Sequence, residues 1–385
     1  MGSSSQAIRY PVATTSARNI DALNRVLADL CTRSNPKDGA ALTLRWLVEE
    51  EAHDLSGEAF ARFMDHIYEL ITTFIDRNEV SENLGALRAI DELIDVTISE
   101  NASKVAKFSN YMSAAFETKR DPEILVLVSE VLGHLDRSGG AMTADEVEHQ
   151  VKVVLEWLHG ERIEYRRFSA ILILKEIAEN ASTVFNVYVS EFVDAIWVTL
   201  RDPTLVVREK AIEELCTCLR VIEELETRWS FSEPQTETSM EHHSTIQLGI
   251  VHLLPKVEIL VTRSSQNVAL RDPMLVVQKK SIEALHACLR VMEKRETRYY
   301  RMFEATEDGL GRNAPVHSIH GSLLAIGELQ RFYLQEVEAL NIGEFMMSRY
   351  RKVAEIVLRY LEHRDRLVCL SITSLLPRIA HFLRD

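Results

Sequence analysis

Apolar residues recur three or four positions apart along most of this chain of 385 residues. One such series comprises Val207, Ala211, Leu215, Leu219 and Ile222. This spacing places apolar side chains on one face of an α-helix, which is buried while the opposite face meets solvent. The same spacing recurs at 84–94, 168–177, 353–361 and 367–376. Because no segment alternates convincingly as a strand would, the pattern predicts helices of about 12–20 residues separated by short breaks.

Asp-Pro pairs precede several of these apolar series, and Asp365 heads a further one without a proline. An Asp side chain at a helix N-cap accepts hydrogen bonds from free backbone N–H groups, and proline at the first helical position loses no intrahelical donor. An Arg one and a half helical turns after such an Asp can reach a neighbouring repeat. We therefore expect helix caps and ties between repeats at Asp121, Pro122, Asp202, Pro203, Arg208, Asp272, Pro273 and Asp365.

Residues 200–229 recur at 270–299. The offset is 70 positions and 19 of the 30 aligned residues are identical, which indicates a direct duplication. The second copy has Gln278 in place of Arg208, so we expect its tie to be weaker. Between the copies, 230–268 opens with a polar, turn-prone stretch that predicts an insertion or linker.

Helix pairs spaced by about 40 residues are typical of HEAT and armadillo repeats. The predicted fold class is therefore all-α, an α-solenoid of antiparallel helix pairs. We expect a disordered N-terminus at 1–18, HEAT repeats at 19–229, the insertion at 230–268, and further HEAT repeats at 269–385. The array is expected to be truncated at its C-terminal end.

Composition supports this interpretation and excludes other classes. With 14 Gly and 9 Pro, the chain has few turn residues for a many-stranded sandwich or barrel. Its net charge of −14 opposes binding to nucleic acid or anionic lipid, and no long apolar run predicts membrane insertion. The five scattered cysteines fit a reducing compartment, and Cys216 and Cys218 lie on different sides of a helix, which disfavours a shared metal.

Candidate catalytic groups have simpler structural explanations. The glycines of 308–312 follow no strand and lack the third glycine of a phosphate loop. His363, Arg364 and Asp365 match the start of a kinase catalytic loop, but Leu370 stands where its metal-binding Asn is required, so a capped turn is favoured. We interpret 317–320 as capping or polar packing. The sequence thus predicts no catalytic residue, no cofactor and no metal site.

Two expectations concern burial. The four tryptophans, Trp46, Trp157, Trp197 and Trp229, have apolar neighbours and are expected in the core. The run Glu49–Glu51 is expected on a solvated helix face.

Several longer sequence segments resemble the sequences of one protein family. They lie at 83–94, 100–105, 139–147, 179–186, 308–324, 343–350 and 358–368. Examples are NLGALRAIDELI at 83–94 and DGLGRNAPVHSIHGSLL at 308–324. These segments closely resemble the N-terminal HEAT region of the target of rapamycin (TOR) serine/threonine kinase family, most of all its plant form. The similarity covers nearly all of 19–229 and 270–385.

The resemblance implies a place in nutrient and growth signalling, in a TOR-type complex of the cytoplasm, with a nuclear pool as an alternative. In that family the kinase domain lies beyond the part matched here, so no kinase domain is expected within the chain. The family's N-terminal solenoid helps to bind the adaptor Raptor and contributes to dimer assembly. A Raptor-like adaptor and self-association are therefore the implied protein contacts.

Three hypotheses follow. In the first, the chain is a non-catalytic scaffold that binds Raptor-like partners. In the second, it is a truncated product of a TOR-like kinase gene without independent function. In the third, it is an independent HEAT adaptor of the phosphatase-scaffold or importin type.

Overall fold

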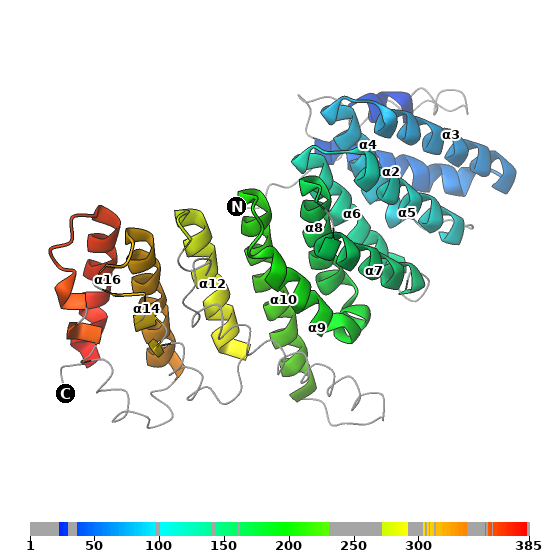
Figure 1. The fold of residues 1–385 in the computed structure, drawn as a ribbon. Helices are drawn as coiled ribbons and strands as arrows, with labels where there is room; N and C mark the ends of the chain where they lie inside the picture. The colour runs from blue at the N-terminus through cyan, green and yellow to red at the C-terminus, as the bar shows by residue number, and fades with distance from the viewer. Residues whose placement is uncertain are drawn as a thin grey trace. The chain divides into compact units, whose positions relative to one another are not determined.

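The computed structural model shows a helical-repeat protein (Figure 1). It describes residues 23–29, 37–96, 101–139, 144–160, 162–230, 272–291, 303–304, 306–307, 309–311, 313–336, 351, 353–355 and 357–382. The predicted N-terminal segment 1–18 and, apart from Ser230, the predicted insertion at 230–268 lie outside these residues. The chain divides into two compact units, Met1–Val184 and Phe185–Asp385.

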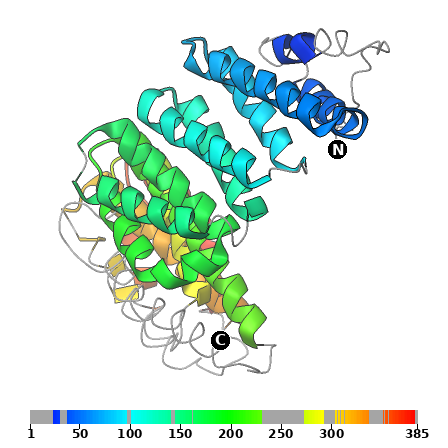
Figure 2. The same cartoon turned by 90° about the vertical axis from the view of Figure 1, so that its right-hand side faces the viewer.

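The first unit consists of helices in two layers. They are α2 (Lys37–Asp54), α3 (Gly57–Asp76), α4 (Val80–Ile94), α5 (Asn101–Thr118), α6 (Pro122–Gly139), α7 (Ala144–Gly160) and α8 (Glu164–Asn180). Helices α2, α4, α6 and α8 pack on one another in succession, while α3, α5 and α7 pack on α4, α6 and α8. Figure 2 shows from a second side that these helices run alongside one another. Short connections make consecutive helices antiparallel, which is the arrangement of HEAT-type pairs.

Apolar stripes form the core of this unit, as their spacing predicts. On α4, Leu84, Leu87, Ile90, Leu93 and Ile94 are all buried. They lie three residues apart from Leu84 to Leu93, with Ile94 adjacent, so one face of the helix meets α2, α3 and α6. The predicted stripe at 168–177 is likewise buried on α8.

In the second unit, long helices pack side by side in a row. Its described long helices are α10 (Leu205–Ser230), α12 (Leu275–Val291), α14 (Val316–Glu336) and α16 (Arg366–Phe382), and α9 (Ser182–Thr199) crosses the boundary between the units. Helix α10 packs on α12, α12 on α14, and α14 on α16 (Figure 1). The two copies of the duplicated sequence, α10 and α12, are therefore direct neighbours. Neither unit contains a strand among its described residues.

The predicted helix starts need one correction. Helix α6 begins at Pro122, directly after Asp121. Helices α10 and α12 instead begin three residues after their aspartates, at Leu205 and Leu275. The first backbone bond of α10 runs from Arg208 N to Thr204 O, because residues 202–204 form a turn before the helix.

Two burial expectations were wrong on α2. Trp46 is 48% exposed, whereas Glu51 is only 4% exposed. The physical reason is helical spacing: Leu44, Leu47 and Val48 form the buried stripe, and Glu51 continues it one turn later, while Trp46 points away. Trp157 is half-buried, and the side chains of Trp197 and Trp229 lie outside those described.

Candidate functional site

An ion pair joins the two copies of the duplicated sequence. Arg208 Nε on α10 lies 3.4 Å from Asp272 Oδ2, which precedes α12. Arg208 Nη1 also donates to the carbonyl oxygens of Asp202 and Pro203, at 2.8 and 3.1 Å. The guanidinium thus closes its own turn and reaches the next repeat. Asp202 Oδ1 and Asp272 Oδ1 each accept from the backbone N–H two residues later, at 2.8 Å.

Gln278 makes the corresponding contact of the second copy without a charge. Its Nε2 donates to Asp272 O at 2.7 Å and to His317 O on α14 at 2.8 Å. Its Oε1 lies 2.6 Å from His320 Nδ1, and burial lowers the pKa of His320. His320, within the segment 317–320 for which the sequence predicts capping or polar packing, thus takes part in polar packing between α12 and α14, and His317 contributes its backbone carbonyl. Whether this tie is weaker than that of Arg208 stays a prediction.

The turn before α16 has the geometry of a capped turn. Asp365 Oδ1 accepts from Leu367 N at 2.9 Å and from Val368 N at 3.4 Å. His363 Nδ1 accepts from Asp365 N at 3.1 Å, and His363 O accepts from Cys369 Sγ. The Asp121 carboxylate has the same arrangement before α6, where its Oδ1 accepts from the backbone N–H groups of residues 123 and 124. These groups are engaged in closing turns.

Exposed aliphatic side chains lie in the first turns of α10, α12, α14 and α16, four of the helices described in the second unit. We call this set the apolar edge, and its members are Val206, Val276, Val316 and Leu367. Each is the first or second residue of its helix and is between 39% and 47% exposed. The contacts of Arg208 and Gln278 hold neighbouring helix starts together, so three of these side chains project from adjoining turns. Exposed apolar side chains that gather on one surface are a feature of protein-interaction sites, whereas single ones are ordinary.

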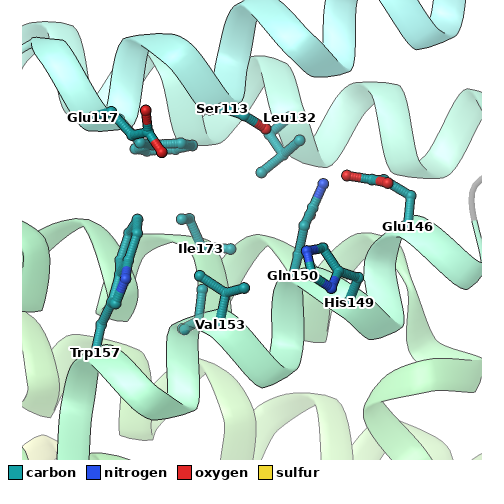
Figure 3. Close-up of a pocket in the computed structure, with 11 residues that line it drawn as sticks. Ser113, Glu117, Leu132, Glu146, His149, Gln150, Val153, Trp157 and Ile173 are labelled. Atoms are coloured by element: carbon teal, nitrogen blue, oxygen red, sulfur yellow. The ribbon is translucent and has the colours of Figure 1, made fainter. Parts of the chain in front are cut away.

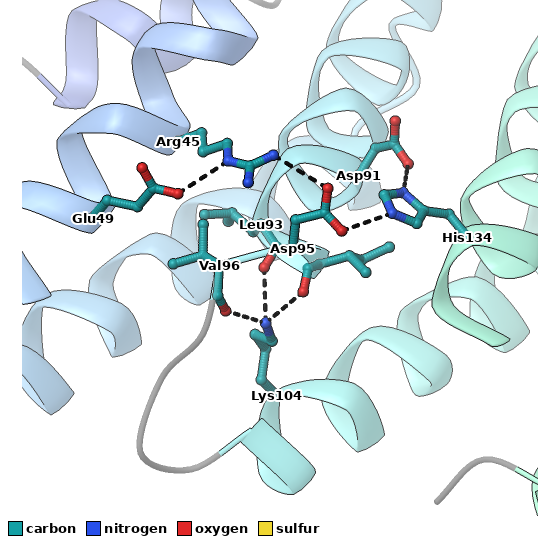
Figure 4. A network of polar contacts seen from close by, with 9 residues as sticks. Arg45, Glu49, Asp91, Leu93, Asp95, Val96, Lys104 and His134 are labelled. Carbon is teal, nitrogen blue, oxygen red and sulfur yellow. Dashed lines mark hydrogen bonds and ion pairs between the residues drawn. The ribbon is translucent and has the colours of Figure 1, made fainter. Parts of the chain in front are cut away.

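A polar network joins four helices of the first unit (Figure 4). His134 on α6 lies between two carboxylates of α4, with Nδ1 2.7 Å from Asp91 Oδ1 and Nε2 3.0 Å from Asp95 Oδ1. Asp95 also receives Arg45 Nη1 from α2, at 3.2 Å. The hydrogen bond to Asp91 raises the pKa of His134, and the contacts with His134 and Arg45 lower the pKa of Asp95 despite partial burial.

Lys104 of α5 completes this network at the C-terminal end of α4 (Figure 4). Its Nζ donates to the carbonyl oxygens of Leu93, Ile94 and Val96, at 3.0, 2.8 and 2.5 Å. Carbonyls at a helix C-terminus have no intrahelical partner, so the ammonium caps the end of α4. Burial lowers the pKa of Lys104 to about 8.

A groove of about 200 Å³ lies between α5 and α7 (Figure 3). Ser113, Phe116 and Glu117 line it from α5, while Glu146, His149, Gln150, Val153, Val154 and Trp157 line it from α7. Leu132 of α6 and Ile173 of α8 complete the lining. Its walls are mostly apolar, and its charged groups are the two carboxylates. We call this site the α5–α7 groove.

Buried carboxyl groups lie on α6 and α8, two helices that also contribute to the lining of the groove. Burial, together with the charges of Glu146 and Glu176, raises the pKa of Asp136 to about 8. Burial also raises the pKa of Glu176, although Lys175 Nζ lies 2.7 Å from its Oε1. Burial therefore favours the protonated, uncharged form of both carboxyl groups.

Catalytic chemistry has little support in these groups. Within the described ranges, no cluster of three or more His, Cys, Asp or Glu side chains has a geometry that would hold a metal ion. Burial raises the pKa of the Cys216 thiol to about 12, which keeps it protonated. None of the described helices is both long and apolar enough to span a bilayer.

Sequence reasoning missed the α5–α7 groove, the Lys104 cap and the apolar edge. The groove lies between α5 and α7, which are separated in the sequence by α6, so the local spacing of apolar residues does not predict it. Lys104 lies in a polar segment of the sequence, so a lysine there is expected to be exposed. The apolar edge has a local signal, since Val206 and Val276 follow the Asp-Pro turns at the same offset.

Comparison with known proteins identifies relatives of the whole chain. It is 56% identical over 388 aligned residues to the serine/threonine-protein kinase TOR of Arabidopsis thaliana, a match that covers 100% of this chain and 13% of the relative. It is 53% identical to the TOR kinase of Oryza sativa subsp. japonica, over 91% of this chain and 11% of the relative. The kinase tor1 of Schizosaccharomyces pombe is 28% identical over 89% of the chain. No family model matches the sequence.

Solved structures share the fold. A crystal structure of a Kap121p mutant superposes with a TM-score of 0.55 and 13% sequence identity, over 94% of this chain and 38% of that protein. The karyopherin Kap121p bound to the extreme C-terminus of the phosphatase Cdc14p gives the same TM-score at 12% identity. At these identities the likeness concerns the fold alone, and it agrees with the predicted all-α solenoid of HEAT type.

The plant and yeast matches confirm the resemblance that the sequence words indicate. The chain spans only 11–13% of the length of these relatives. It is thus a homologue of a helical-repeat segment of the TOR serine/threonine-protein kinases.

Proposed function

We propose that this chain is a non-catalytic scaffold that binds a Raptor-like adaptor in TOR-type nutrient and growth signalling. The observation that carries the proposal is the 56% identity to a plant TOR kinase over the whole chain, in a fold built of helical repeats. Stacked helical repeats present long surfaces on which proteins dock. The proposal places the chain in TORC1-type complexes of the cytoplasm, with a nuclear pool and self-association as further parts of it.

The apolar edge supports a role in protein binding. Four aliphatic side chains at successive helix starts give a partner a repeated apolar contact. Polar groups that cap the same turns, such as Asp272 and Gln278, are already engaged within the chain. An adaptor that docks here would therefore gain apolar burial without breaking the ties between repeats.

Co-purification tests the proposal. The tagged full chain is incubated with plant cytosol, and captured proteins are identified by mass spectrometry with a direct search for Raptor. We expect Raptor to be recovered with the wild-type chain. Its absence from the captured material, with the chain folded by circular dichroism, would refute the adaptor role and favour a truncated gene product without function of its own.

A matched pair of variants tests the surface. Val276→Glu changes the net charge by one and places an acidic group in the first turn of α12, where the helix dipole favours it. Lys279→Gln changes the charge by the same amount at an exposed position of the same helix. We expect Val276→Glu to reduce Raptor recovery at least fivefold and Lys279→Gln to leave it unchanged. Equal recovery with both variants would exclude the apolar edge as the contact surface.

A further inference from the structure

The α5–α7 groove is lined by two carboxylates. Glu117 stands on one wall and Glu146 on the other, and no Lys or Arg is among the residues that line the groove. Ser109 Oγ contacts Glu146 Oε1 only at 3.5 Å. Both carboxylates belong to exposed residues. The groove is therefore electrostatically suited to a cation.

The shape of the groove favours a cation on a long apolar stem. Phe116, Leu132, Val153, Val154, Trp157 and Ile173 make its walls apolar. Its volume of about 200 Å³ exceeds the ~150 Å³ cavity that holds benzene in another protein, so one long side chain fits. Lysine and arginine side chains bury their aliphatic stems on such surfaces and keep the charged group near water.

One buried acceptor distinguishes arginine from lysine. Gln150 Oε1 is buried and has no hydrogen-bond partner among the described residues. Gln150 and Glu146 stand one helical turn apart on α7 and line the same groove (Figure 3). A guanidinium carries five donors in a planar fork and can serve a carboxylate and an amide oxygen together, whereas an ammonium is a point charge. The guanidinium of Arg166 lies 5.8 Å from the ring centroid of Trp157, so a cation of this chain already occupies the indole face. We therefore assign the attraction of an incoming cation to the carboxylates.

We propose that the α5–α7 groove binds an arginine side chain of a basic, apolar segment of a partner protein. The aliphatic stem lies on the apolar walls, and the guanidinium donates to Gln150 Oε1 and to the rim carboxylate Glu146, which stands at the same end of the groove (Figure 3). This inference rests on the proposed protein-binding function and names the chemistry that one surface of the scaffold recognises.

Binding of three matched peptides tests the inference. Each is a short, capped, fluorescein-labelled peptide with leucines around one central residue, which is arginine, lysine or the uncharged isostere citrulline. Fluorescence anisotropy with the full chain measures their affinities at low and physiological salt. We expect the arginine peptide to bind at least tenfold more tightly than the citrulline peptide and several-fold more tightly than the lysine peptide, with salt weakening its binding.

Variants localise the binding. Glu146→Gln keeps shape and removes charge at an exposed position, so the fold is retained, and it is expected to weaken binding of the arginine peptide several-fold. Glu117→Gln does the same at the other end of the groove and is expected to weaken binding less. Glu156→Gln removes an exposed charge from the same helix outside the groove and is expected to change nothing. No binding by the wild-type chain, equal binding of arginine and citrulline peptides, or equal loss in Glu156→Gln would each overturn the inference.

Raptor capture separates this inference from the proposed function. If Raptor is captured but the arginine peptide does not bind, the groove inference fails and the adaptor role stands. If the arginine peptide binds in the groove but Raptor is not captured, the inference stands and the proposed adaptor role fails.

Discussion

Replacement of Lys104 by methionine is expected to destabilise the first unit. The Lys104 side chain is 1% exposed, and its Nζ donates to three carbonyl oxygens at the end of α4. Methionine keeps an unbranched apolar stem of similar length, so the substitution removes the ammonium and leaves three buried carbonyls without that donor. Leu93 O also accepts from Val96 N at 3.3 Å, so the loss concerns mainly the carbonyl oxygens of Ile94 and Val96. An unsatisfied buried carbonyl is costly because water cannot reach it.

The magnitude follows from two opposing effects. Hydrogen bonds from a charged group contribute ~1.5–3 kcal/mol each, and there are three of them. A pKa that falls from 10.5 to about 8 means that burial of the ammonium costs about 3 kcal/mol, which methionine would recover. The carbonyl bonds prevail, so we expect Lys104→Met to lower the free energy of unfolding by at least about 2 kcal/mol at pH 7.

The pH dependence gives a second signature with a definite sign. Because the folded-state pKa of Lys104 is lower than the unfolded value, the unfolded chain binds more protons between pH 8 and 10.5. The contribution of Lys104 to stability therefore rises with pH across that window and is constant below it. The difference in unfolding free energy between the wild-type chain and Lys104→Met should widen from pH 8 upward.

Urea unfolding followed by circular dichroism measures the global effect. Hydrogen exchange of peptides that cover α4 and α5 measures the local one, because repeat proteins need not unfold in a single step. Lys107→Met is the control, since Lys107 lies on the same helix with a half-exposed side chain 3.5 Å from Asp65, and should cost less than about 1 kcal/mol. Lys104→Met with unchanged or increased stability at pH 7 would refute the reasoning.

Three further predictions concern ties between helices. Arg208→Met should lower the stability of the α10–α12 pair by about 1–2 kcal/mol because it removes a partly buried ion pair and two carbonyl bonds, seen as faster hydrogen exchange in both helices; unchanged exchange would contradict this. Gly133→Ala should destabilise by about 1 kcal/mol in urea unfolding despite its better helix propensity, because the new Cβ would lie 2.9 Å from Glu176 Cβ; a more stable variant would show that α6 and α8 can separate freely. His134→Asn should remove the stability that the raised pKa of His134 confers, which is fully present below the unfolded value near 6.5 and is lost as pH rises through the folded value. Thermal unfolding at several pH values measures it, and the same pH profile in the variant would contradict it.

Much of the fold was predictable because it follows from local spacing. The stripe from Leu84 to Ile94 is buried as predicted, since one face of a helix collects residues three and four apart. The Asp-Pro signals located turns, but the structure places the starts of α10 and α12 three residues later. Trp46 and Glu51 were predicted wrongly because residue type was given more weight than position on the helix.

The candidate site was much less predictable. Lys104 and Gln150 are ordinary polar residues in the sequence, and their partners lie on other segments or, for Gln150 Oε1, are absent among the described residues. The acidic rim of the groove joins Glu117 and Glu146, which are separated by a complete helix. No spacing rule connects positions so far apart, because their meeting depends on how α5 and α7 pack across α6 and α8.

The sequence by itself determined the helices, the duplicated segment and the kinship with TOR kinases, because periodicity and long identical words are properties of neighbouring residues. Tertiary structure alone decided which polar groups face one another. It turned Arg208 toward Asp272, brought Lys104 beneath α4 and enclosed an acidic groove between α5 and α7. Those outcomes depend on the distances between packed helices, and through them on charge and burial, which the linear order of residues does not contain.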